Sequence, residues 1–95
     1  MQSVKTYSLS FMHQLVKEAE YSLRGRQHFN VHGSYEEPCQ RLFNAIRPTS
    51  YIRPHRHLSD PKEEFIFAVM GRSYLLQFND DGGVSNVVML ASEKY

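Results

Sequence analysis

The chain has 95 residues, which fits one domain, with 41% apolar residues, 22% charged residues and a net charge of +1. No block of like charge suggests a nucleic-acid partner, and no apolar run is long enough to span a membrane. The first residues lack the zones of a signal peptide, so we expect a cytoplasmic protein. The single cysteine, Cys39, excludes an internal disulfide.

The first predicted element is a helix over residues 8–24. Apolar residues recur there at spacings of three, four and seven, and the opposite face is polar. The apolar positions are Leu9, Met12, Leu15, Val16, Ala19 and Leu23. Ser8 or Ser10 can cap the start of the helix, and Gly25 can end it. We expect the apolar stripe to pack against the rest of the domain.

After Gly25 the sequence changes to short apolar runs separated by turn residues, which predicts strands. The expected strands cover 28–32, 40–46, 50–57, 64–70, 72–79 and 84–90. Asp80-Asp81-Gly82-Gly83 predicts a hairpin between the last two strands. Many short strands and no second helix predict a mostly β fold, an antiparallel sandwich or barrel.

We expect a single domain in which residues 1–25 form a helical segment that packs on a β-barrel of residues 26–95. The chain ends soon after its last expected strand, and a barrel needs its edges paired. The expectation is therefore either an incomplete barrel or strand exchange with a second copy in a homodimer.

Arginines are concentrated in one part of the sequence. Six of the seven fall between Arg24 and Arg56, where the acidic residues are Glu36 and Glu37. The planar guanidinium suits carboxylate and phosphate groups. If these side chains converge, they form a pocket for a small anionic metabolite. Taken singly, each arginine is more often a solvated surface residue.

A group of potential metal ligands lies next to this segment. Strand alternation places His55 and His57 on one face and Arg56 on the other. Glu64 begins the next expected strand and can add a carboxylate, with Glu63 as the rival. Two histidines and a carboxylate form an open ligand set that suits Fe, Mn, Ni or Zn. We therefore predict one divalent metal ion held by His55, His57 and Glu64.

The order of these residues resembles the first cupin motif, G(X)5HXH(X)3,4E(X)6G. Thr49 stands at the leading glycine, and His55-Arg56-His57 follows after five residues. Six residues separate His57 from Glu64, and six separate Glu64 from Gly71. Two features depart from the motif: Thr49 replaces a glycine, and the gap before Glu64 is two or three residues longer. The longer gap is tolerable for a loop.

Cupins usually add a fourth ligand from a second motif, G(X)5PXG(X)2H(X)3N. This chain has no histidine beyond His57, so the resemblance leaves that ligand unassigned. His32 is the candidate replacement. The alternative is that His32 is a hydrogen-bonded histidine near the site.

Further residues resemble the WbuC family of cupin-fold metalloproteins, over roughly residues 9–90. The residues that carry this resemblance are Arg26, Asn30-Val31-His32, Gln40-Arg41-Leu42-Phe43-Asn44-Ala45-Ile46, Pro48, Ser50-Tyr51 and Arg53-Pro54-His55-Arg56-His57. The resemblance implies a jelly-roll barrel, a bound metal and a link to bacterial O-antigen and surface-polysaccharide (lipopolysaccharide) genes.

Two functions follow as expectations. The first is a metal-dependent isomerase, epimerase or oxygenase that acts on a small anionic metabolite, such as a sugar or nucleotide sugar. The second is a non-catalytic binding or sensing module with a weak or vestigial metal site. The expected ligand-binding residues are Asn30, Gln40, Arg41 and Arg53. His32 and Tyr51 are the candidate acid–base groups, and the sequence names no reaction.

Overall fold

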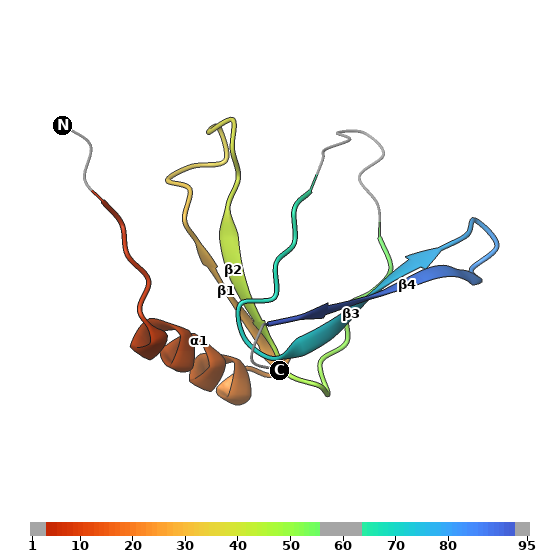
Figure 1. Ribbon diagram of the computed structural model, residues 1–95, viewed down its shortest axis with the longest axis horizontal. Helices are drawn as coiled ribbons and strands as arrows, with labels where there is room; N and C mark the ends of the chain where they lie inside the picture. The colour runs from red at the N-terminus through yellow and green to blue at the C-terminus, as the bar shows by residue number, and fades with distance from the viewer. Residues whose placement is uncertain (1–3, 56–63, 93–95) are drawn as a thin grey trace. The chain divides into compact units, whose positions relative to one another are not determined.

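The computed structural model describes residues 4–55 and 64–92. The chain divides into two compact units, Met1–Ile52 and Arg53–Tyr95. The first contains a helix and a two-stranded sheet, and the second contains another two-stranded sheet (Figure 1).

Helix α1 (Leu9–Tyr21) opens the first unit. Ser8 caps it, since its Oγ accepts a hydrogen bond from the Phe11 N–H at 3.1 Å. At the other end, Gly25 adopts a left-handed φ of 67°, which turns the chain into the first strand. The helix predicted over 8–24 is thus confirmed, and it ends three residues earlier because the chain turns from Ser22 onward.

Strands β1 (Arg26–Asn30) and β2 (Leu42–Ile46) pair antiparallel, and α1 lies along one face of this sheet (Figure 1). Phe29 lies opposite Phe43 in the register. Both rings contact Tyr7 and Phe11, with ring centroids 4.9 to 6.1 Å apart. This aromatic cluster, with the buried Leu15 and Ala19 of α1, forms the core of the unit.

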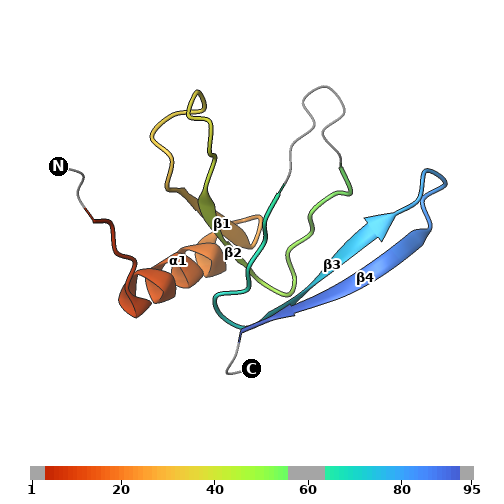
Figure 2. The ribbon, with the colours of Figure 1, turned by 45° about the horizontal axis from the view of Figure 1, so that its top comes forward.

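The second unit contains β3 (Arg72–Phe78) and β4 (Val84–Ala91), which pair as an antiparallel hairpin (Figure 2). The Asn79 N–H donates to the Gly83 carbonyl at 2.7 Å, and Gly82 has a φ of 89°. Glycine reaches this conformation without steric cost, so it suits the turn. The hairpin predicted from the Asp-Asp-Gly-Gly sequence is confirmed.

The mostly β class with one helix is confirmed by these two small antiparallel sheets. The strand expected over 50–57 is wrong for residues 50–55, and the strand expected over 64–70 is wrong throughout, because neither segment joins a ladder. Residue 51 instead uses its carbonyl to accept a hydrogen bond from the Arg26 side chain. Within the described part of the chain, the strands close no barrel. No helix there is long and apolar enough to cross a membrane.

Candidate functional site

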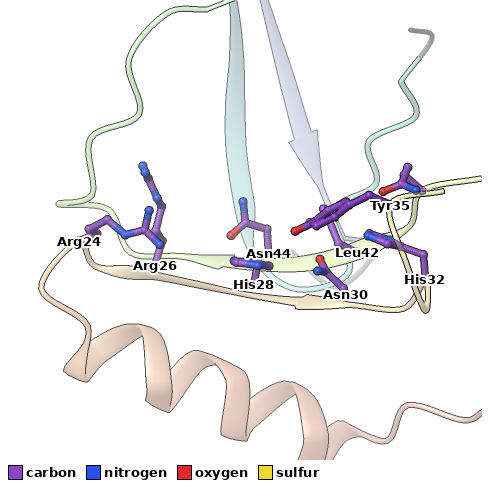
Figure 3. A pocket seen from close by; sticks show the side chains of 9 residues that line it. Arg24, Arg26, His28, Asn30, His32, Tyr35, Leu42 and Asn44 are labelled. Carbon is purple, nitrogen blue, oxygen red and sulfur yellow. The ribbon is translucent and has the colours of Figure 1, made fainter. Parts of the chain in front are cut away.

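A pocket of about 320 Å³, lined mostly by polar residues, opens on the first unit. Its lining residues are Arg24, Arg26, His28, Asn30, His32, Tyr35, Gln40, Leu42 and Asn44. In Figure 3 these side chains, from the β1–β2 sheet and the segments that flank it, lie on the side of the sheet away from α1. The volume falls within the range of small-molecule sites.

Strand alternation explains why polar side chains gather on this face. Phe29 and Phe43 point toward α1, so their neighbours in each strand point to the other face. His28 lies directly opposite Asn44 in the register, two residues from the Asn30–Leu42 pair. The packing of the aromatic rings therefore fixes which side chains face the pocket.

Two arginines occupy one end of the pocket (Figure 3). The Ser50 hydroxyl donates to the Arg24 carbonyl at 2.7 Å, which ties this turn to the segment after β2. Arg26 Nη1 donates to the Tyr51 carbonyl at 2.9 Å, one of the five N–H donors of its guanidinium. No carboxylate is among the described residues that line the pocket, so this end carries positive charge.

His32 lies at the other end of the pocket. Among the described residues it is the one polar side chain that is buried, with 6% of its surface exposed. Its Nδ1 is 2.8 Å from the Arg41 carbonyl oxygen and 3.0 Å from the Arg41 backbone nitrogen. Its Nε2 is buried and has no hydrogen-bond partner within the described residues. The Tyr35 ring lies against it, with centroids 5.6 Å apart.

The loop between β1 and β2, which follows His32, is braced by its own hydrogen bonds. The Gln40 side-chain nitrogen donates to the carbonyls of Ser34 at 3.2 Å and Glu37 at 3.0 Å. The Glu37 carboxylate accepts from the Gly33 N–H at 2.6 Å. Gln40 lines the pocket as a predicted ligand-binding residue should, but both of its amide hydrogens are engaged in the loop.

The pocket includes some of the predicted ligand-binding residues and not others. Asn30 and Gln40 line it, whereas Arg41 and Arg53 are not among the lining residues and are exposed. Arg41 contributes its backbone to His32. Tyr51, a candidate acid–base group, is 74% exposed and contributes its carbonyl to Arg26.

Six of the nine lining residues were not among the predicted site residues: Arg24, Arg26, His28, Tyr35, Leu42 and Asn44. The signal for two of them was present. Once the phenylalanines of both strands are assigned to the helix side, alternation assigns His28 and Asn44 to the other side. Tyr35 lies in the loop, where no periodicity applies.

The three main predicted metal ligands belong to the second unit, where only some are described, and the candidate fourth ligand, His32, belongs to the first. His55 and Glu64 are exposed, and His57 and the rival Glu63 lie outside the described residues. His55 Nδ1 is 2.8 Å from the Arg53 carbonyl oxygen. A contact of this kind commonly orients a histidine that binds metal through Nε2. Among the described residues, no three His, Cys, Asp or Glu side chains lie close enough to hold an ion together.

Comparison with known proteins gives one family. The model of a domain of unknown function, DUF6016, matches residues 7–90. No curated protein and no solved structure matches the sequence. Because the match covers α1 and all but the last residue of the four described strands, the chain belongs to the DUF6016 family.

Proposed function

We propose that this protein binds a small anionic, sugar-like metabolite in the pocket of the β1–β2 sheet. The observation that carries the proposal is that Arg24 and Arg26 line the same pocket as the neutral polar side chains of Asn30 and Asn44. No carboxylate is among its lining residues. Guanidinium groups bind carboxylate and phosphate through paired, charge-assisted hydrogen bonds. Amide side chains both donate and accept, as sugar hydroxyls require.

The exposure of the pocket sets the expected strength of binding. Arg24, His28 and Asn44 are exposed and Arg26 is half-buried, so water competes for each contact. We therefore expect modest affinity, with a Kd on the order of 10 µM to 1 mM, which corresponds to about 4 to 7 kcal/mol.

A second candidate function concerns metal. We propose that His55, His57 and Glu64 hold one Fe, Mn, Ni or Zn ion, as the cupin-like spacing implies. The Arg53 carbonyl beside His55 Nδ1 supports this proposal, because that contact suits a metal-binding histidine. A bound ion would supply a Lewis acid or an oxygen-binding centre for an isomerase, epimerase or oxygenase reaction.

The resemblance to WbuC cupins adds the remaining parts of the proposal. These are a jelly-roll barrel and an O-antigen-related sugar or nucleotide sugar as the ligand. We also propose a homodimer in which exchanged strands pair the edges of the barrel, since a barrel needs its edges paired. A binding or sensing module without turnover is the alternative function.

Calorimetric titration with glucose 6-phosphate, and with neutral glucose as its uncharged match, tests the pocket. We expect binding of the phosphate ester only, weakened about tenfold in Arg26→Gln and in Arg24→Gln. The control is Arg72→Gln, which removes an arginine of β3 that does not line the pocket and should change affinity less than twofold. Equal binding of glucose, or an equal loss in all three variants, would refute the proposal.

Elemental mass spectrometry of the purified protein tests the metal site. We expect about one ion per chain in the wild type and none in a His55→Ala/His57→Ala double variant. No metal in either protein after reconstitution would remove the metal proposal and leave the pocket proposal intact.

A further inference from the structure

One polar atom of the pocket has no partner within the described residues. The His32 side chain is more than nine-tenths buried, and its Nε2 is without a hydrogen bond. Buried polar side-chain atoms in native proteins are nearly always hydrogen-bonded, because an unmet group loses its water without replacement. His32 also lines the pocket (Figure 3), so a bound molecule is the natural source of the missing partner.

The Arg41 backbone indicates which hydrogen His32 carries. Nδ1 faces both the Arg41 N–H and the Arg41 carbonyl, and it can serve only one of them. The carbonyl already accepts from the Val31 N–H at 2.8 Å. If Nδ1 were protonated, the Arg41 N–H would lose its acceptor, and backbone N–H groups are rarely left unpaired. We therefore assign the tautomer with a bare Nδ1 and a hydrogen on Nε2.

The hydrogen-bond donor at Nε2 lies far from the arginines. Arg26 begins β1, and His32 lies six residues later along a chain that is largely extended. At about 3.3 Å per residue, their Cα atoms are up to about 20 Å apart. The side chains lie at opposite ends of the row in Figure 3. A phosphate ion therefore contacts only the arginine end, and a ligand that contacts both ends must be elongated.

The Tyr35 ring is a neighbour of the His32 ring and lines the same pocket. It lies against the His32 ring, yet the Tyr35 side chain is 81% exposed, so few contacts hold it there. A sugar ring that displaced the Tyr35 ring would put its own apolar face against the flat His32 ring, a surface that suits such a contact. An incoming ligand can thus reach the donor without disturbing the aromatic cluster under the sheet.

We infer that the pocket takes an elongated sugar phosphate, whose anionic group binds Arg24 and Arg26 and whose far hydroxyl or carbonyl oxygen accepts a hydrogen bond from His32 Nε2–H. This inference rests on the proposed function and adds the length and orientation of the ligand. His32 acts here as a positioning group at the end of the pocket.

Two probes with the same phosphate and different lengths test the inference. Trehalose 6-phosphate carries a second sugar ring that glucose 6-phosphate lacks. We expect trehalose 6-phosphate to bind about tenfold more tightly, a gain that the second ring makes by reaching His32. His32→Asn keeps an acceptor for the Arg41 N–H but has no group at the Nε2 position, so it should abolish this gain. His32→Gln places an amide N–H near the Nε2 position and should keep much of the gain.

Long-range ¹H–¹⁵N spectra of the ligand-free wild type give a readout that needs no variant. We expect a protonated Nε2 and a bare Nδ1 at His32. A protonated Nδ1, or release of the Nε2 hydrogen on addition of zinc, would overturn the assignment and favour a metal-ligand role. Equal affinities for the two sugar phosphates would overturn the inference alone, whereas no binding of either would overturn the proposed function as well.

Discussion

Replacement of Phe11 by alanine tests whether the aromatic cluster is the main source of stability in the first unit. Phe11 contacts the rings of Tyr7, Phe29 and Phe43, with centroids 5.2, 5.0 and 5.6 Å away. A fully buried Phe→Ala change costs about 3–5 kcal/mol, and Phe11 is half-buried. Three aromatic contacts add to the lost area, each worth about 0.5–1.5 kcal/mol and not fully additive. We therefore expect a loss of about 2–3 kcal/mol.

Urea denaturation, monitored by circular dichroism at the helix band, measures this loss, because α1 is the one helix among the described residues. With a slope of about 1–1.5 kcal/mol per molar urea, the midpoint should fall by about 2 M. Tyr21→Ala is the matched control, since Tyr21 also lies on α1 but is 80% exposed. It should change stability by less than about 0.5 kcal/mol. Equal losses in the two variants would refute the role of the cluster.

Three further substitutions probe the ends of the elements and the loop. Ser8→Ala removes the hydroxyl that accepts from the Phe11 N–H and should cost about 1 kcal/mol in the same urea assay; Ser8→Asp should restore the lost stability. Gly25→Ala places a side chain at a left-handed φ of 67°, which is strained for any residue with a Cβ, so its urea midpoint should reveal a loss of at least about 1 kcal/mol. Gln40→Ala frees the loop carbonyls, so hydrogen exchange at residues 33–37 should accelerate while α1 keeps its protection.

The elements that were predicted correctly are those that a local sequence pattern specifies. The 3.6-residue period and Ser8 gave α1, and the Asp-Asp-Gly-Gly turn gave the β3–β4 hairpin. Apolar content alone misled at residues 64–70, where Phe65 and Phe67 remain 83% and 80% exposed and join no ladder. An apolar run favours burial but does not name a neighbouring strand, and a strand exists only with its partner.

The arginine bias predicted a pocket lined by arginines but not which arginines line it. Arg41 and Arg53 were expected to bind the ligand, whereas Arg24 and Arg26 line the pocket. The choice depends on the register with β2 and on the turn at Gly25, which no spacing in the sequence reports. The metal ligands stay a prediction from spacing, since His57 lies outside the described residues.

Side chains at even-numbered positions of β1 and β2 point to the pocket side of the sheet, and those at odd-numbered positions point toward α1. Substitutions at His28 or Asn44 can therefore change ligand specificity without altering the phenylalanines that pack against α1. These positions are suitable sites for randomisation in directed evolution. The same arrangement makes the sheet intolerant of length changes. One residue inserted within β1 would exchange the two faces beyond that point, so that polar groups met the aromatic core and rings lined the pocket.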